Sequence, residues 1–107
     1  MNNLEKTIYM NRLFSIYGEL LSHSQKEILS DYYENNLSIT EIADEKNISR
    51  SAVEDALKKG SNKLLHYEKE LGICSKSDEI VKILEKIKNK IKDEEVLKDI
   101  EEIGRKL

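Results

Sequence analysis

Six polar side chains between positions 50 and 63 have the types and the spacing of a nucleic-acid contact surface. They are Arg50, Ser51, Glu54, Lys58, Lys59 and Lys63. On a helix, Arg50 and Ser51 would occupy the first turn, where base edges or phosphates are usually met, and the lysines would add phosphate contacts. Glu54 could accept a hydrogen bond from the amino group of cytosine. It could equally pair with Arg50 and Lys58, each four residues away, so its role stays open.

The rest of the chain offers no second chemistry. It has no glycine-rich phosphate loop, no Cys-x-x-Cys pair, and no Ser, His and Asp in a recognisable catalytic frame. The two histidines, His23 and His66, occur in unrelated contexts, and a lone histidine does not make a metal site. The sequence therefore predicts a protein that is not an enzyme and that needs no metal and no cofactor.

The charge of the chain limits how tightly such a surface could bind nucleic acid. The net charge is −3. Residues 1–48 and 93–107 are net acidic, at −4 and −3, whereas residues 49–75 and 76–92 are net basic, at +1 and +3. Each phosphate contact needs a cation, and two carboxylates lie among the lysines of the contact surface. We therefore expect no tight nonspecific binding to duplex DNA, although a local basic surface is compatible with this composition.

The elements that would position the six residues are two helices joined by a tight turn. Ser38 and Glu41 form a capping box, so the first helix should begin at Ile39. Asn47 tolerates the left-handed backbone conformation that the turn requires, and Ser49 can cap the second helix. Two helices joined in this way form a helix-turn-helix, which places its second helix in the major groove when it binds DNA.

Apolar residues at helical spacing predict which sides of these helices are buried. They are Ile39, Ile42, Ala43, Ala52, Val53, Ala56 and Leu57. The small Ala43 would let the two helices cross closely, and Ile48 would fill the corner between them. The second helix should continue to Leu71, where Gly72 suits a helix end, with Gly60 as its weak point.

Two amphipathic helices are expected before this unit. The first spans residues 4–21, with Asn3 as its cap. The second covers about residues 25–35, opened by a capping box of Ser24 and Glu27. With no proline and only four glycines in 107 residues, the sequence predicts an all-α protein.

Two further helices are expected after Gly72, folded as a hairpin. Ser77 should cap the first and Asp93 the second. Their apolar positions repeat at spacings of 4, 3 and 4 residues: Ile80, Leu84, Ile87 and Ile91, then Val96, Ile100, Ile103 and Leu107. A hairpin is too small to bury eight such side chains, so we expect a homodimer through these helices. The alternative is that the hairpin folds back on the long helix near Tyr67 and Leu71 within one chain.

These patterns predict a helix-turn-helix domain over residues 1–73 and a C-terminal helical hairpin over residues 74–107, which packs on that domain or dimerises. No apolar run approaches the roughly 20 residues needed to cross a membrane, so no membrane partner is expected. The single Cys74 cannot form an internal disulfide, and no signal peptide is recognised. A reducing cytoplasm is the expected location.

Several stretches carry a resemblance to known families. Leu-Leu-Ser-His-Ser-Gln-Lys-Glu-Ile-Leu, Asn-Leu-Ser-Ile-Thr-Glu-Ile-Ala and Ile-Ser-Arg-Ser-Ala-Val, within residues 20–66, resemble the promoter-reading C-terminal domain of bacterial sigma factors. The chain is too short to hold the polymerase-binding half of such a factor. The pair Tyr32-Tyr33, residues 49–55, and the Leu-x-x-Tyr-Glu-x-x-Leu segment within residues 63–71 make the whole chain more similar to the YlxM family of small bacterial helix-turn-helix proteins.

That resemblance implies a regulatory protein with a sigma-like helix-turn-helix bundle, a long recognition helix and a C-terminal helical hairpin. It also implies a link to the signal recognition particle pathway, because genes of the family neighbour the gene of the particle's GTPase. The implied ligand is DNA, the particle's RNA or the GTPase itself, and composition and spacing do not choose between them. The rival interpretation is a protein-interaction adaptor whose helix-turn-helix is structural.

Overall fold

The computed structural model describes residues 1–107 and confirms the all-α prediction, because it contains helices and no β-strand. The helices are α1 (Asn3–Tyr17), α2 (His23–Leu29), α3 (Ile39–Lys46), α4 (Arg50–Leu71), α5 (Ile73–Lys88) and α6 (Glu94–Arg105). A 3-10 turn, Gly18–Leu20, follows α1, and a π-helical turn, Ser30–Glu34, continues α2. The contacts divide the chain into two units, Met1–Leu71 and Gly72–Leu107. None of the helices combines the length and apolar character that crossing a bilayer requires.

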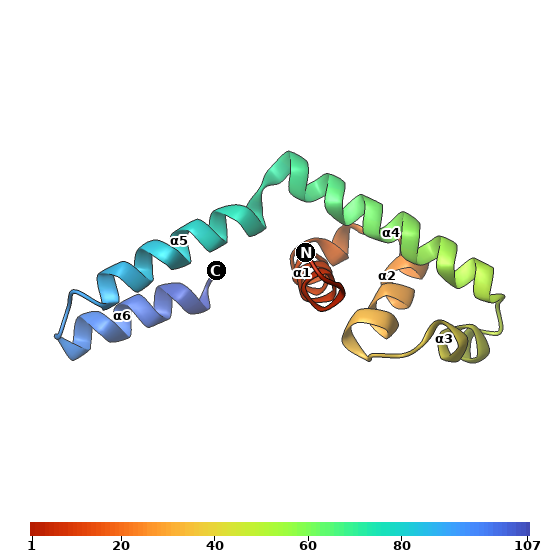
Figure 1. Cartoon of the computed structure of the whole chain (residues 1–107), viewed down its shortest axis with the longest axis horizontal. Coiled ribbons are helices and arrows are strands. Elements are labelled where there is room, and N and C mark those ends of the chain that lie inside the picture. The colour runs from red at the N-terminus through yellow and green to blue at the C-terminus, as the bar shows by residue number, and fades with distance from the viewer. The chain divides into compact units, whose positions relative to one another are not determined.

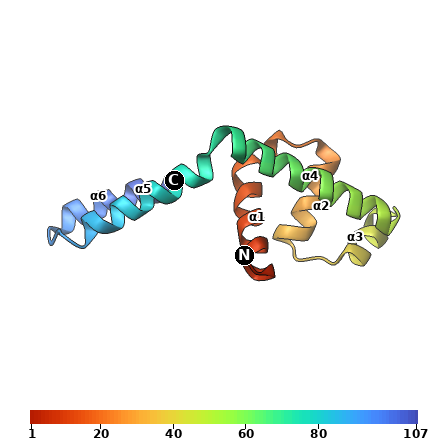
Figure 2. The ribbon, with the colours of Figure 1, turned by 45° about the horizontal axis from the view of Figure 1, so that its top comes forward.

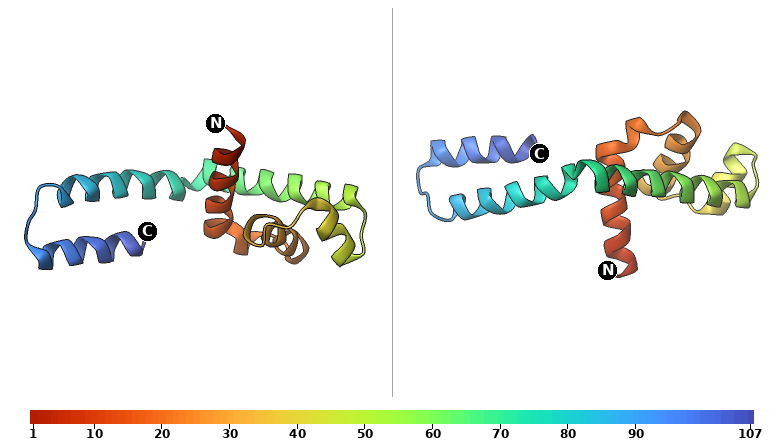
Figure 3. Two further views of the ribbon diagram at one scale, coloured as in Figure 1. Left: turned by 60° about the horizontal axis from the view of Figure 1, so that its bottom comes forward. Right: turned by 90° about the horizontal axis from the view of Figure 1, so that it is seen from above.

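Helix α4 is the central element of the first unit. The helices α1, α2 and α3 all contact it, and they lie along its length (Figures 1 and 2). Figure 3 shows α1 crossing α4 steeply. The buried residues of α4 are Val53, Gly60 and Leu64, whose spacing of seven and then four residues marks one helical face. This long helix therefore supplies one apolar stripe that three shorter helices cover.

The core of the first unit collects apolar side chains from each of its helices. They are Leu13, Phe14, Tyr17, Leu21, Ile28, Leu29, Ile42, Ala43, Val53 and Leu64. Burial of one large aliphatic side chain is worth about 1.5–3 kcal/mol, so these residues provide the main stabilising term. The one polar atom among these side chains is satisfied, because the hydroxyl of Tyr17 donates a hydrogen bond to Glu68 Oε1 at 2.7 Å.

Gly60 allows a close approach between α2 and α4. A Cβ atom at this position would lie 2.7 Å from Cδ1 of Leu29, a distance that packed Cβ atoms essentially never show. The interpretation of Gly60 as a weak point of the helix was therefore incomplete. A glycine inside a helix costs about 1 kcal/mol relative to alanine, but here it makes room for a fully buried leucine.

Two predicted helix starts are wrong by one or two residues. Asn2 rather than Asn3 caps α1, by accepting the backbone N–H three residues further on at 2.8 Å. Ser22 rather than Ser24 caps α2, with the corresponding distance at 3.4 Å. Glu27, the expected partner of Ser24 in a capping box, instead contacts His23 and forms an ion pair with Lys46. Both members of each pair are residues that favour caps, so the sequence alone does not separate them.

The second unit is the predicted helical hairpin, in which α5 and α6 lie side by side and run in opposite directions (Figure 3). Asp93 caps α6 as predicted, by accepting two backbone N–H groups of the first turn at 2.9 and 3.4 Å. The predicted cap of α5 is wrong, because α5 begins at Ile73 and Ser77 lies inside it. Gly72 has a φ of +64°, so a single left-handed residue ends α4 and starts α5.

Candidate nucleic-acid interface

The turn between α3 and α4 is held by the local hydrogen bonds that the sequence predicts. The capping box is complete, because Ser38 Oγ accepts the Glu41 N–H and Glu41 Oε1 accepts the Ser38 N–H, both at 3.1 Å. At the other end of α3, Asn47 is left-handed with a φ of +55°. The Ile48 N–H then donates to the Ala43 carbonyl at 3.1 Å, which closes the turn. Ile48 is 39% exposed, so it fills the corner between the helices only in part.

Ser49 fixes the point at which α4 begins. Its Oγ accepts the Ala52 N–H at 3.0 Å, and its carbonyl accepts the Val53 N–H at 3.2 Å. Arg50 and Ser51 therefore occupy the first turn of α4. Val53 points into the core, whereas Ala52, which was expected on the inner side, is exposed. The cap thus decides which residues of the first turn face outward.

An apolar cluster anchors α3 and α4 to α2. The buried members are Ile28, Ile42, Ala43 and Val53, and the partly buried residues packed against them are Leu37, Ile39, Ala56 and Leu57. Ala43 is only 4% exposed, so its small side chain is enclosed on the inner side of α3. The two helices of the helix-turn-helix are therefore positioned by a packed core rather than by surface loops.

All six predicted contact residues are exposed on α4, but they do not form a single group. At about 100° per residue, four of them share one outward arc of about 100°. These four are Arg50, Ser51, Glu54 and Lys58. Lys59 and Lys63 lie about 180° and 220° around the helix from Arg50. The structure therefore brings the first four together and places the other two on a different flank.

The two lysines of that other flank already have partners. Lys59 Nζ lies 3.0 Å from Asp55 Oδ2, an ion pair across one turn of α4. Lys63 Nζ donates a hydrogen bond to Gln25 Oε1 of α2 at 3.1 Å. A phosphate that approached either ammonium group would compete with these contacts. An exposed ion pair or hydrogen bond of this kind is worth about 1 kcal/mol or less, so the competition is weak.

The cations of the outward arc have no such partner. Neither Arg50 nor Lys58 forms an ion pair within 4.0 Å, and Glu54 pairs with neither of them. The helix-surface ion pair that was one of the two roles open for Glu54 is therefore not formed. Its carboxylate stays exposed on the same arc as Arg50 and Lys58, where it can accept hydrogen bonds from a ligand.

Two further residues extend the outward arc and were missed in the sequence analysis. They are Asn62 and Lys69, and both are exposed. With Ser51 and Lys58 they form the series Ser51, Lys58, Asn62 and Lys69, with spacings of seven, four and seven residues. That spacing keeps all four on one side of a helix. The side-chain amide of Asn62 can both donate to and accept from base edges. The helical period was the signal that could have found these two residues.

Acidic side chains dominate α3, the helix that precedes this arc and contacts α4. The exposed acidic residues of α3 are Glu41, Asp44 and Glu45. Lys46, the only basic residue of α3, is engaged by Glu27 at 3.2 Å and by Asp31 at 3.7 Å. The whole first unit, residues 1–71, holds nine basic and twelve acidic residues, which gives a net charge of −3. The candidate interface is therefore a narrow cationic strip on an acidic unit.

Comparisons with known proteins give matches over nearly the whole chain. Residues 4–103 match the model of a family described as "Putative helix-turn-helix protein, YlxM / p13 like". A UPF0122 protein of Mycoplasma capricolum is 40% identical over 103 residues, covering 95% of this chain and 91% of the relative. A UPF0122 protein of Thermoanaerobacter sp. is 39% identical over 107 residues, covering 94% and 92%. One from Bacillus cereus is 41% identical over 92 residues, covering 86% and 84%.

Proposed function

We propose that this chain, which belongs to the YlxM/p13-like family of helix-turn-helix proteins, is a cytoplasmic regulatory protein. In this proposal it binds nucleic acid through α4. The observation that carries this proposal is the outward arc of α4. There, Arg50 and Lys58 are exposed and unpaired, on a helix whose start is fixed by a cap and whose inner side is buried. A rigid helix with free cations at its N-terminal end suits the groove of a nucleic-acid duplex.

The roles within the arc follow from the chemistry of the side chains. Arg50 in the first turn would contact a phosphate or the O6 and N7 acceptors of guanine. Ser51 would bond a phosphate oxygen or a base edge, and Glu54 would accept from the amino group of cytosine. Lys58, one turn further on, would contact the backbone. Protein side chains carry this recognition, and the proposal includes no catalytic step, metal or cofactor.

The narrowness of the cationic strip makes binding selective rather than strong. Arg50, Lys58, Lys59 and Lys63 together could neutralise about four phosphates, and each contact gives a salt dependence of about −0.9 in log K against log salt on duplex DNA. Raising the salt from about 50 to 200 mM would then weaken binding about a hundredfold. The acidic surroundings oppose nonspecific coating of DNA, as expected for a regulator that acts at particular sites.

The ligand and the pathway are further parts of the proposal. The ligand is DNA or the RNA of the signal recognition particle, with the GTPase of that particle as an additional protein partner. Support for this pathway comes from the resemblance to the YlxM family. A homodimer belongs to the same proposal, because the hairpin leaves large apolar side chains exposed and a paired helix-turn-helix could contact two half-sites.

The alternative is a protein-interaction adaptor in which the helix-turn-helix is structural. The observation that favours it is the net charge of −3 on residues 1–71, together with Glu54 and Asp55 on the presumed recognition helix. An acidic surface repels phosphates and suits a basic protein partner. Such a partner would also bind in a salt-dependent way, so the charge of the required residues has to be tested directly.

The test is a binding assay with the full chain on a pool of random-sequence duplexes and on the particle's RNA, at 50 and 200 mM salt. Changing Arg50, Lys58, Lys59 and Lys63 to glutamate should abolish binding, because the cations that meet the phosphates are reversed. The melting temperature should not change, since exposed charges rarely move stability by more than about 0.5 kcal/mol. Circular dichroism would confirm unchanged helicity.

A matched control reverses four cations outside α4. Lys6, Lys76, Lys92 and Lys98 are exposed, and their change to glutamate alters the net charge by the same amount. This control should retain most of the affinity. If the control and the α4 variant lose binding equally, net charge rather than the arc is responsible. If the wild type binds none of the probes, nucleic-acid binding is wrong and the adaptor becomes the better interpretation.

A further inference from the structure

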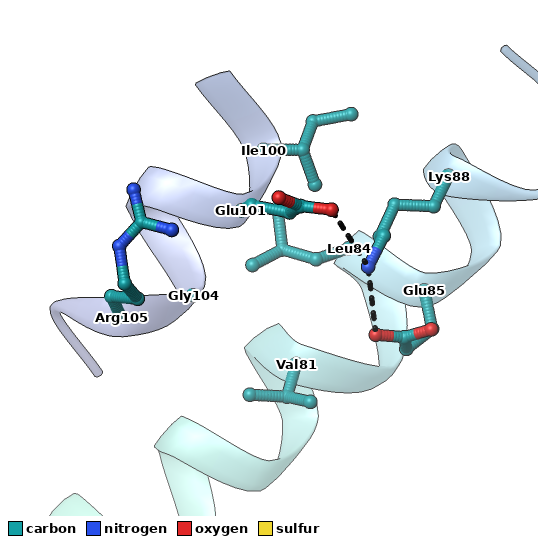
Figure 4. Close-up of a pocket in the computed structure, with 8 residues that line it drawn as sticks. All are labelled: Val81, Leu84, Glu85, Lys88, Ile100, Glu101, Gly104 and Arg105. Carbon is teal, nitrogen blue, oxygen red and sulfur yellow. Dashed lines mark ion pairs between the residues drawn. The ribbon is translucent and has the colours of Figure 1, made fainter. Parts of the chain in front are cut away.

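The hairpin of α5 and α6 has two unlike sides. On one side, a groove of about 320 Å³ between the helices is lined by four charged residues, Glu85, Lys88, Glu101 and Arg105, and by Val81, Leu84, Ile100 and Gly104 (Figure 4). Figure 4 shows Lys88 between Glu85 of its own helix and Glu101 of α6, with nitrogen–oxygen distances of 3.8 and 4.0 Å. This side mixes charged and apolar side chains, with Val81 39% exposed, and its central lysine is already paired.

The other side of the hairpin is apolar and uncovered; we call it the apolar face. Each of its six side chains is more than a third exposed: Ile80, Ile83 and Ile87 on α5, Val96 and Ile103 on α6, and Leu107 two residues beyond the end of α6. At about 100° per residue, each set is rotated about its own helix axis by roughly 80° from the side that contacts the other helix. The sense of rotation along the chain is the same on both helices. Because the helices are antiparallel, this rotation brings both sets to one face.

The two outer borders of the apolar face carry opposite charge. Along α5 the border residues are Glu79, Lys82 and Lys86, followed by Lys90 in the turn after the helix. Along α6 they are Glu95, Asp99 and Glu102, followed by Lys106 directly after the helix. None of these eight side chains forms an ion pair within 4.0 Å. The only ion pair between the two helices is that of Lys88 with Glu101. Most of the opposite charges on α5 and α6 therefore form no ion pair with each other within the hairpin.

The borders also match residue by residue. Each helical residue rises about 1.5 Å, so the distance of a residue from the loop, measured along the helix axis, follows from its number. We call this distance its level, and border residues of opposite charge on the two helices have nearly equal levels. The matched levels are Lys90 with Glu95, Lys86 with Asp99, Lys82 with Glu102, and Glu79 with Lys106. The last pair reverses the sign on both helices and still matches. A surface with this order of charges is complementary to itself.

We infer that the apolar face binds the same face of a second copy of this chain, with α5 of each copy against α6 of the other. A two-fold axis parallel to the helices produces this pairing and keeps the levels aligned, so the four border pairs form twice. An in-plane axis across the helices would instead place α5 on α5 and α6 on α6, with like charges opposed. The result is a four-helix bundle that encloses the twelve side chains of the two apolar faces.

This pairing mode rests on the homodimer included in the proposed function, but it does not depend on nucleic-acid binding. The experiment is sedimentation equilibrium of the full chain at tens of micromolar. The wild type should have twice the monomer mass of 12.4 kDa. Ile83→Glu with Ile103→Glu should be monomeric, because a buried carboxylate on the apolar face raises the dissociation constant more than about a hundredfold. Leu4→Glu with Ile8→Glu, exposed on α1, should stay dimeric.

Charge reversal tests the arrangement of the helices. Changing Lys82, Lys86 and Lys90 to glutamate should raise the dissociation constant at least about tenfold, since six border contacts become repulsive. Adding the changes of Glu95, Asp99 and Glu102 to lysine in the same chain should restore the dimer. The control changes Lys6, Lys59 and Lys69, which are exposed in the first unit, to glutamate, and this gives the same net charge without altering the hairpin. It should remain dimeric.

Each outcome decides a separate point. A wild-type mass near 12.4 kDa would remove both the dimer and its mode, whatever the nucleic-acid assay gives. A dimer that ignores the glutamates at Ile83 and Ile103 would exclude the apolar face as the interface. If the variant with the three lysine reversals still dimerises but forms mixed dimers with the wild type more readily than dimers with itself, α5 of one copy packs on α5 of the other. This result would contradict the pairing of α5 with α6. Failure of the six-residue swap to restore pairing would overturn the proposed mode.

Discussion

The two units of this chain use the same kind of amphipathic helix, but they bury it to different extents. Of the twelve buried apolar residues, ten belong to Met1–Leu71, and only Cys74 and Ile100 belong to Gly72–Leu107. In the first unit, α4 has three helices on its apolar stripe. In the second, α5 and α6 have only each other within the hairpin. The number of neighbouring helices, rather than the width of an apolar stripe, therefore determines what fraction of its side chains is buried.

This difference predicts different stabilities. A pair of helices supplies little buried apolar area for the residues that it orders, so small helical units usually need a partner or a staple. The first unit has a core from four helices, and its turn is fixed by backbone hydrogen bonds. We expect the hairpin to open locally at a lower free energy than α4, in the sense measured by amide hydrogen exchange. Substitutions in the two units should therefore have unequal effects.

The largest expected effect comes from removing a core leucine. Leu64→Ala should lower the free energy of unfolding by about 2–5 kcal/mol, because Leu64 is 0% exposed and its truncation leaves a cavity in the core. Ile83→Ala, at 54% exposed in the hairpin, should cost less than about 1 kcal/mol in dilute, monomeric protein. Urea denaturation measures both. Equal losses would show that the hairpin is packed as tightly as the first unit.

The next effect comes from adding volume to the crossing of α3 and α4. Ala43→Leu should destabilise the protein by about 1–3 kcal/mol, because the residue is 4% exposed among well-packed neighbours. Ala52→Leu is the matched control, since Ala52 is exposed on the outer side of α4, and it should be nearly neutral. Melting temperatures compare the two. An unchanged melting temperature for Ala43→Leu would mean that the helices do not cross at this residue.

Glycine substitutions compare the two units directly. Gly60→Ala should destabilise by about 1–2 kcal/mol, because its Cβ would meet Leu29 while the gain in helix propensity offsets only part of the clash. Gly104→Ala in α6 meets nothing within 4 Å and should be neutral or stabilising. Denaturant midpoints measure both changes. A stabilising Gly60→Ala would show that α2 can move away from α4 without loss.

The smallest effect is expected in the turns. Asn47→Ala should cost about 1 kcal/mol, because the left-handed φ of +55° suits asparagine better than alanine. Asn89→Ala, at the end of α5, has a φ of −70° and should cost almost nothing. Thermal unfolding followed by circular dichroism would compare them. A larger loss at Asn89 would indicate that the loop of the hairpin, rather than the helix-turn-helix turn, depends on its backbone conformation.

Local signals predicted much of the fold. The capping box at Ser38, the left-handed Asn47, the cap at Ser49 and the cap at Asp93 are all as the sequence predicts, since each is a bond between residues a few positions apart. The errors arose where a choice between similar signals depended on packing. Ser77 has the chemistry of a cap, but Gly72 had already started α5.

The candidate site could be predicted in part. Residue types and spacing were enough to choose six exposed positions on α4. They were not enough to show that Lys59 and Lys63 are engaged by Asp55 and Gln25, because the second of these contacts joins residues far apart in the chain. Asn62 was missed, although the helical period alone places it beside Lys58 on the outward arc.

The sequence by itself determined that this protein is helical, where its helix-turn-helix lies, and which turn residues it uses. These features depend on backbone propensities and on contacts within a few residues. Only the tertiary structure decided that Gly60 admits Leu29, that Arg50 and Lys58 stay unpaired, and that α6 leaves one side of α5 uncovered. Those outcomes depend on which distant side chains compete for the same space, and a linear pattern does not record that competition.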